Sequence, residues 1–165
     1  MRRSLGSVRY RTAFTRLKSG AVNVKIRLET RNVAHVKRIL IVDDSPIIRR
    51  SLRIVLEQQP DWGVCGEAGN GRDGIDKALQ LRPDLVVIDL VMPVMNGIEA
   101  SRTLKKLAPA TTLVMFTTFA DPCLTKDALA AGVDAVVPKS EGATTLIRSI
   151  QTLLVTKFPP PASAA

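Results

Sequence analysis

Five short runs of hydrophobic residues alternate with longer stretches in which hydrophobic residues recur every three or four positions. The runs lie at about 38–43, 63–67, 84–89, 112–117 and 133–137. Apolar runs without polar alternation are typical of strands covered on both faces, as in a parallel sheet. Because helical periodicity fills the stretches between them, we expect five strand–helix units forming a single α/β domain with a doubly wound parallel sheet.

Residues that start or break helices mark the ends of the expected helices. The first helix begins at Asp44-Ser45-Pro46 and stops at Pro60, and the second follows Gly71 and ends before Pro83. The other three helices are expected at about 96–107, 121–131 and 142–156. The connections are therefore short, as in other alternating α/β folds.

Acidic residues directly follow two of the expected strands. Asp43 and Asp44 come after the first strand, and Asp89 comes after the third. Open α/β sheets bind their ligands in the crevice at the carboxyl ends of the strands. Three acids in that crevice form a negative pocket, which predicts a bound cation.

Basic residues are concentrated at the start of the chain. The net charge is +9, but residues 1–35 contain nine Arg or Lys and one acid, Glu29, so they carry +8 of it. We expect residues 1–36 to form a disordered basic arm, although the alternating segment 22–29 permits an additional strand. The Pro-rich residues 158–165 predict a disordered tail, which leaves 37–157 as the folded domain.

The sequence also argues against several classes of protein. No hydrophobic stretch reaches the roughly 18 residues that span a bilayer, and the arm lacks the apolar core of a secretory signal, so we expect a cytoplasmic protein. Cys65 and Cys123 have no zinc-site or disulfide pattern, and we expect both to be buried free thiols.

The acids belong to a larger pattern in which each member lies at the end of an expected strand. Its members are Asp43-Asp44, Asp89 within Asp89-Leu90-Val91-Met92-Pro93-Val94-Met95-Asn96-Gly97, Thr117 and Lys139. From Asp44 to Lys139 the successive separations are 45, 28 and 22 residues. In these features the chain resembles the receiver domain of bacterial two-component response regulators. The resemblance implies five helices around a flavodoxin-like sheet with strand order 2-1-3-4-5.

The resemblance also implies phosphoryl transfer at Asp89. This carboxylate would attack the phosphorus of a phosphohistidine on a sensor histidine kinase or a phosphotransfer protein. Lys139 would pair with Asp89 before transfer and with a phosphoryl oxygen after it, and the Thr117 hydroxyl would donate to another phosphoryl oxygen. The protein would not be a turnover enzyme, because it would catalyse only its own phosphorylation and dephosphorylation.

A magnesium ion completes the implied site. Attack of a carboxylate on an anionic phosphoryl group requires charge neutralisation, and Mg²⁺ prefers oxygen ligands. By resemblance its ligands would be Asp44, Asp89 and the backbone carbonyl of Val91, with Asp43 positioning a metal-bound water.

Simpler roles remain open for three of these residues. Asp43 is a candidate helix cap, Lys139 a candidate solvated charge and Thr117 a candidate strand former. A phosphatase of the haloacid dehalogenase type would also use a strand-end Asp with Mg²⁺, but it needs a second acid two residues later, where this chain has Val91.

Two departures from the family pattern predict altered behaviour. Val136 occupies a position that is commonly aromatic in the family, so we expect the signal to depend more on movement of the fourth helix than on rotation of a side chain. Val91 and Phe119 are apolar at positions that, in this family, flank the path of the water that hydrolyses the phosphorylated aspartate. Since neither can orient that water, we expect a long-lived phosphorylated form.

We expect the domain to pass on its signal through contact with a partner protein. Segments 62–71 and 138–141 resemble receivers fused to helix-turn-helix domains, but no such domain is expected after Lys157. We therefore expect a single-domain regulator in a phosphorelay that signals to an unknown partner through its fourth and fifth helices, with no membrane or DNA binding. The alternatives are a truncated transcriptional regulator and a protein that binds nucleic acid through its basic arm.

Overall fold

The computed structural model describes residues 12–16, 22–26 and 36–157. The chain divides into two compact units, residues 1–34 and 35–165. In the first unit, β1 (Thr12–Arg16) and β2 (Val22–Ile26) pair as antiparallel strands. Strand β2 falls in the alternating segment for which the sequence permitted an additional strand. Apart from β1, β2 and residue 36, the predicted disordered arm lies outside the described residues, and so does the predicted disordered tail.

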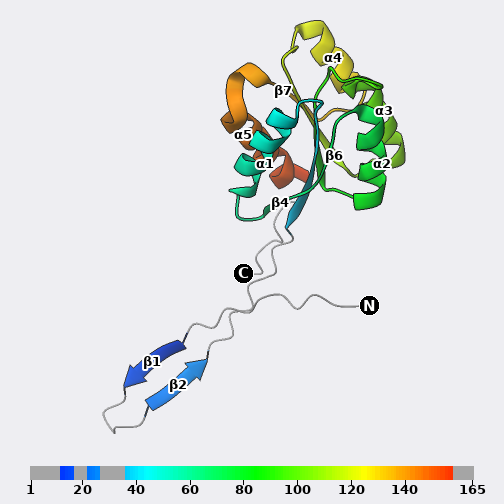
Figure 1. The fold of residues 1–165 in the computed structure, drawn as a ribbon. Helices are drawn as coiled ribbons and strands as arrows, with labels where there is room; N and C mark the ends of the chain where they lie inside the picture. Colours follow the sequence, from blue (N-terminus) through cyan, green and yellow to red (C-terminus); the bar gives the residue numbers. More distant parts are fainter. Residues whose placement is uncertain (1–11, 17–21, 27–35, 158–165) are drawn as a thin grey trace. The chain divides into compact units, whose positions relative to one another are not determined.

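A five-stranded parallel sheet forms the centre of the second unit (Figure 1). Its strands in spatial order are β4 (Trp62–Ala68), β3 (Lys37–Val42), β5 (Leu85–Ile88), β6 (Thr112–Thr117) and β7 (Ala135–Pro138). Counted from the first strand of this unit, the order is 2-1-3-4-5, which confirms the predicted fold. Each strand lies within two residues of its predicted bounds.

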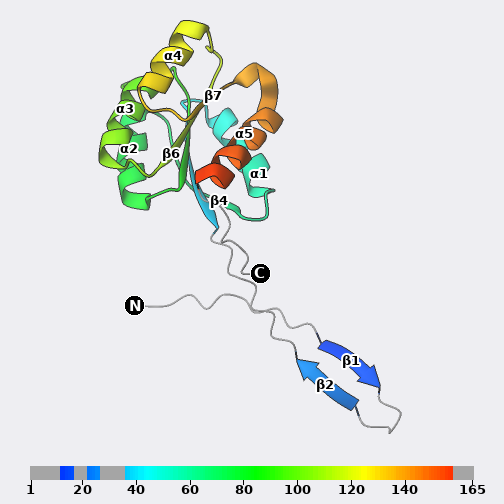
Figure 2. The same cartoon turned by 180° about the vertical axis from the view of Figure 1, so that it is seen from behind.

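Helices cover both faces of this sheet (Figures 1 and 2). On one face lie α1 (Pro46–Glu57) and α5 (Gly142–Lys157), and on the other lie α2 (Gly71–Leu81), α3 (Gly97–Leu107) and α4 (Pro122–Ala130). A short 3-10 turn, η1 (Lys139–Glu141), joins β7 to α5 and was not predicted. The five predicted helices are confirmed.

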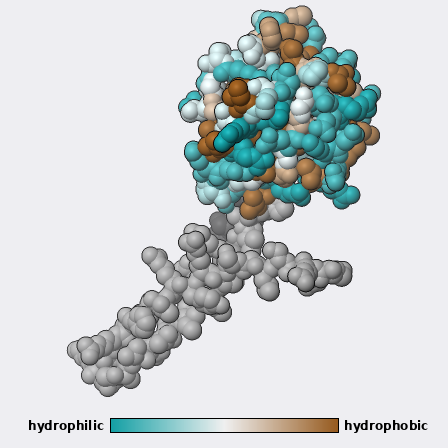
Figure 3. Space-filling model, in the orientation of Figure 1, coloured by the Kyte–Doolittle hydropathy of each residue, from teal (hydrophilic) through white to brown (hydrophobic). Residues whose placement is uncertain are grey.

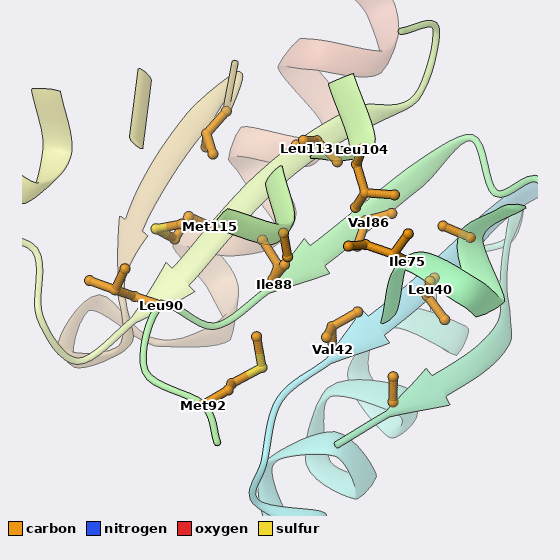
Figure 4. Packing of buried hydrophobic residues seen from close by; sticks show 14 of the residues in the cluster. Leu40, Val42, Ile75, Val86, Ile88, Leu90, Met92, Leu104, Leu113 and Met115 are labelled. Atoms are coloured by element: carbon orange, nitrogen blue, oxygen red, sulfur yellow. The ribbon is translucent and has the colours of Figure 1, made fainter. Parts of the chain in front are cut away.

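Alternate residues of the central strands point into two separate cores. Leu40, Val86 and Leu113 pack against α2, α3 and α4, as Figure 4 shows for part of this cluster. Their neighbours Ile39, Val87 and Val114 pack against α1 and α5. The strands are apolar on both faces for this reason, and their carboxyl ends form one edge of a rigid layer.

The two cysteines are free, but the prediction that both are buried is wrong. Cys123 is exposed in the first turn of α4, and Cys65 is half-buried on the edge strand β4. Edge strands and first helical turns are covered on fewer sides than central strands, which outweighs the usual tendency of cysteine to be buried. Burial raises the pKa of the Cys65 thiol, which therefore stays protonated at neutral pH.

The exposed hydrophobic residues of the second unit lie on several elements. Examples are Ile47 on α1, Leu129 on α4 and Val155 on α5. On the face seen in Figure 3, hydrophilic residues predominate and the hydrophobic ones form separate patches. None of the helices in the described ranges is both long enough and apolar enough to span a bilayer.

Candidate functional site

Four strands present polar residues at the carboxyl edge of the sheet. Asp43 and Asp44 follow β3, Asp89 follows β5, Thr117 ends β6 and Lys139 follows β7. These strands are neighbours in the sheet. The topology therefore brings together positions that are up to 96 residues apart in the sequence.

The three aspartates form a compact cluster. Asp43, Asp44 and Asp89 each offer a carboxylate oxygen, and these oxygens all lie within 4.8 Å of one another. Asp43 is 2% exposed and Asp89 is 7% exposed, whereas Asp44 is exposed to solvent. Like charges this close repel strongly when they are partly removed from water. The cluster therefore needs a compensating cation.

Lys139 supplies part of that compensation. Its Nζ atom lies 2.7 Å from Asp43 Oδ2 and 2.7 Å from Asp89 Oδ2. Burial lowers the pKa of Lys139, but hydrogen bonds and charge attraction from Asp43 and Asp89 outweigh burial and raise the pKa above its usual value. The side chain is 17% exposed, so it is not the solvated surface charge that the sequence left open.

Backbone N–H groups hold the other oxygen of each buried carboxylate. The Ser45 N–H donates to Asp43 Oδ1 at 2.9 Å, and the Leu90 N–H donates to Asp89 Oδ1 at 2.7 Å. The N-cap of α1 is Ser45, whose hydroxyl accepts from the Ile48 N–H, so Asp43 does not serve as the cap of that helix. Both buried carboxylates are thus oriented by one N–H and one ammonium.

Close packing of a glycine fixes the segment after Asp89. The Gly97 N–H donates to the Leu90 carbonyl at 2.8 Å. A Cβ atom at this position would overlap the Asp89 carbonyl oxygen. A residue with a side chain at 97 would therefore push the start of α3 away from Asp89 at the end of β5.

Thr117 and two apolar residues lie at the β5 and β6 ends of the site. Thr117 is fully buried, and its Oγ1 accepts a hydrogen bond from the Phe119 N–H at 3.2 Å. Val91 is 53% exposed and Phe119 is 56% exposed. Both line a largely apolar cavity of about 480 Å³, together with residues that include Leu90, Met92 and Leu124. From the sequence, Val91 and Phe119 were expected to flank the path of the attacking water, but this cavity was not predicted.

The contacts of Arg49 with this site were not predicted from the sequence. Its Nη1 atom donates to the carbonyl oxygens of Asp43, at 2.7 Å, and Asp44, at 3.2 Å. Asp43 and Asp44 precede α1 and are reached through their backbone, so no pattern of side chains in the sequence indicates this contact.

The donor atoms suit a hard divalent cation. Asp43, Asp44 and Asp89 offer carboxylate oxygens alone, without sulfur or imidazole, and one of the three acids is open to solvent. Mg²⁺ binds through one or two carboxylates and keeps several waters, which suits a half-open cluster of this kind. The chain's own residues thus fit the ion that the resemblance implies.

A flavodoxin-like sheet with this constellation at its carboxyl edge defines the class of receiver domains. Residues 39–151 match the family model of the response regulator receiver domain, and the chain belongs to that family. Receiver domains bind Mg²⁺ at an acidic pocket, are phosphorylated on aspartate by histidine kinases or phosphotransfer proteins, and are in general not enzymes.

Curated relatives differ in their named functions. The chain is 40% identical over 116 residues to a protein-glutamate methylesterase/protein-glutamine glutaminase of Nocardioides sp. (strain ATCC BAA-499 / JS614), covering 69% of this chain and 32% of that protein. It is 34% identical over 116 residues to the transcriptional regulatory protein LnrK of Bacillus subtilis (strain 168), covering 70% and 53%. The chain thus matches about a third to a half of these relatives.

Solved structures share the fold. The response regulator domain of Thermotoga maritima CheB has a TM-score of 0.67 and 33% identity, with 71% of this chain and 95% of that chain covered. A LuxR-family two-component response regulator from Aurantimonas sp. SI85-9A1 has a TM-score of 0.70 and 32% identity, with 72% and 85% covered.

Proposed function

We propose that the unit spanning residues 37–157 is a phosphorylation-controlled switch in which Asp89 accepts the phosphoryl group. The observation that carries this proposal is the shared ammonium of Lys139, 2.7 Å from both Asp43 and Asp89 inside the acidic cluster. A buried carboxylate that is oriented and only partly neutralised is suited to attack an electrophile.

In the proposed reaction, a carboxylate oxygen of Asp89 attacks the phosphorus of a phosphohistidine. A P–O bond forms as the P–N bond breaks, and the electron pair of that bond goes to the imidazole, which takes up a proton. The Lys139 ammonium moves its hydrogen bond from Asp89 to a phosphoryl oxygen. The Thr117 hydroxyl, whose Oγ1 accepts from the Phe119 N–H, donates its own proton to a second phosphoryl oxygen.

Asp44, Asp89 and the Val91 carbonyl would hold Mg²⁺, and Asp43 would orient one of its waters. Bound there, the ion neutralises charge on the phosphoryl oxygens. Asp43 and Asp89 are held in place by the Ser45 and Leu90 N–H groups, so little reorganisation is required on binding.

Signalling would proceed through protein contact at α4 and α5. The hydrogen bond between Thr117 Oγ1 and the Phe119 N–H joins the site to the loop that leads into α4. If the Thr117 side chain moves toward a phosphoryl group, its Oγ1 is drawn away from the Phe119 N–H, which weakens this bond and allows the loop to move. Relatives with two differently named functions match about 70% of this chain, which supports a receiver whose signal is read by different partners.

The test is phosphorylation of the full chain by acetyl phosphate, followed by intact-mass spectrometry. We expect one phosphoryl group per chain, dependent on Mg²⁺ and absent in Asp89→Asn. Asp76→Asn, which changes an exposed acid on α2, is the matched control and keeps the modification. Labelling that persists in Asp89→Asn would contradict the assignment.

A further inference from the structure

Arg49 forms two hydrogen bonds to the backbone of the adjacent acids Asp43 and Asp44. We call this pair of bonds the Arg49 clasp. From α1 its Nη1 atom donates to both the Asp43 and Asp44 carbonyl oxygens, at 2.7 and 3.2 Å. One guanidinium nitrogen thus holds two successive peptide units at the end of β3. The planar, fixed geometry of arginine makes such a double contact directional.

Glu67 on β4 holds the other side of the same guanidinium. Its Oε2 atom accepts from Arg49 Nε at 3.2 Å, and its Oε1 atom accepts from Arg53 Nε at 2.7 Å. Burial raises the pKa of Glu67, but Arg53 and Arg49 outweigh burial and lower the pKa below its usual value, so Glu67 stays ionised. Lys77 from α2 donates to the Glu67 carbonyl at 2.6 Å. The clasp is therefore anchored to two helices and a strand.

Asp44 is the acid whose position most depends on this clasp. Asp43 and Asp89 are fixed by N–H groups and by Lys139, whereas the Asp44 side chain is exposed. The direction of an exposed side chain follows mainly from its backbone. Mg²⁺ demands nearly ideal octahedral geometry, so a small rotation of the Asp44 peptide would weaken its binding.

We propose that Arg49 is a positioning residue that sets the backbone of Asp43 and Asp44 for Mg²⁺ binding. This inference rests on the proposed function, because it takes the acidic cluster as the magnesium site. Arg49 is not one of the residues that would hold the ion or the phosphoryl group, and it acts through the Asp43 and Asp44 carbonyls.

Positioning and simple electrostatics predict opposite results. A positive charge near the cluster repels a cation, so removing it should tighten Mg²⁺ binding if charge alone matters. If Arg49 positions the peptides, removing it should weaken binding. A purely structural role would lower the melting temperature and leave the Mg²⁺ affinity of the folded protein unchanged.

The experiment is a titration of the full chain with Mg²⁺ alone, in which the NMR signals of backbone amides near Asp89 report binding of the ion. We expect Arg49→Met to weaken Mg²⁺ binding about 10- to 100-fold, the usual effect of losing a partner that orients metal ligands. Arg49→Lys keeps the charge but not the fork, and we expect about 10-fold weaker binding. Arg49→Lys also covers the case in which Arg49→Met does not fold.

Two controls separate this inference from the proposed function. Arg50→Met changes the exposed neighbouring arginine and should leave the affinity unchanged. Asp44→Asn should abolish binding at the site, and if it does not, or if the wild type does not bind Mg²⁺ there, the proposed metal site fails and this inference fails with it. If Asp44→Asn loses binding while Arg49→Met and Arg49→Lys bind as tightly as the wild type or tighter, only the role of Arg49 is overturned.

Discussion

The two ends of the parallel sheet carry similar clusters with opposite charge ratios. At the carboxyl end, Lys139 is shared by Asp43 and Asp89, and Asp44 lies nearby. At the amino end, Asp134 is shared by two lysines, with Lys105 Nζ at 3.1 Å and Lys157 Nζ at 2.8 Å. The first cluster has an excess of acids and the second an excess of cations.

The difference distinguishes the cluster that we propose to be reactive from a structural one. The Asp134 carboxylate also accepts the Leu113 N–H at 2.8 Å, so partners surround it and tie α3, α5 and β6 together. The acids around Lys139 remain under-compensated, which costs stability but leaves them able to bind a cation and to react. Functional sites commonly retain such locally unfavourable arrangements.

Replacing one lysine in each cluster should separate the two clusters most strongly. We expect Lys139→Met to slow phosphorylation by acetyl phosphate about 10²- to 10³-fold, because a preorganised cation at the developing charge is lost. Lys157→Met should leave the rate unchanged, since Asp134 keeps Lys105. The measurement is the initial rate by intact mass at saturating Mg²⁺. Equal rates in the two variants would remove the distinction.

Side chains around the reactive cluster should affect chemistry more than stability. We expect Phe119→Glu and Val91→Asn to accelerate loss of the phosphoryl group about 10- to 100-fold, because a polar group can orient the attacking water. The measurement is the decay of the phosphorylated form after removal of acetyl phosphate. Leu129→Glu, an exposed apolar-to-acid change on α4, is the matched control. If neither site variant decays faster, the apolar residues do not protect the phosphoryl group.

The reactive cluster was easier to predict from the sequence than the structural one. Asp43, Asp44, Asp89 and Lys139 each follow an apolar run, and the sheet order brings such strand ends together whatever the loops do. Asp134 also neighbours a strand, but its partners lie on α3 and α5, and no spacing in the sequence indicates which lysines reach it.

Contacts made through the backbone could not be predicted from the sequence either, because no spacing in the sequence indicates them. The Arg49 clasp depends on where two carbonyl groups point at the end of β3, and the sequence does not encode that orientation in any pattern of side chains. The exposure of Cys123 depends on its place in the first turn of α4 and not on its residue type. Base rates of burial therefore failed where position on an element decided the outcome.

Removing the acid at the amino end should cost stability. We expect Asp134→Asn to lower the free energy of unfolding by about 2 kcal/mol at pH 7, less than the 3–5 kcal/mol of a fully buried pair because the side chain is 19% exposed. Urea unfolding followed by circular dichroism measures the loss, and Asp76→Asn is the surface control. A loss no larger than in that control would contradict a structural role.

The effect of Asp134 on stability should also depend on pH. Burial raises the pKa of Asp134, but the bonds from Lys157, the Leu113 N–H and Lys105 outweigh burial and lower the pKa below its usual value. A lowered carboxyl pKa stabilises the fold above the unfolded pKa of about 3.9, and this contribution is lost as the pH falls through the folded value. The difference in the free energy of unfolding between wild type and Asp134→Asn should therefore be constant from pH 7 to 5 and shrink below pH 4. A difference that does not shrink at all below pH 4 would mean that charge is not its cause.

The smallest expected effect comes from Mg²⁺ itself. A concentration of ten times the dissociation constant should stabilise the wild type by about 1.4 kcal/mol, because only the folded cluster binds the ion. Asp44→Asn relieves repulsion among the acids, so we expect it to be more stable than the wild type without Mg²⁺ and to gain nothing when Mg²⁺ is added. Asp134→Asn should gain as much as the wild type, because its change lies at the other end of the sheet. Thermal unfolding with and without Mg²⁺ measures all three. If Asp44→Asn were destabilised without the ion, the acids of the carboxyl end would already be compensated, and the contrast between the two clusters would not hold.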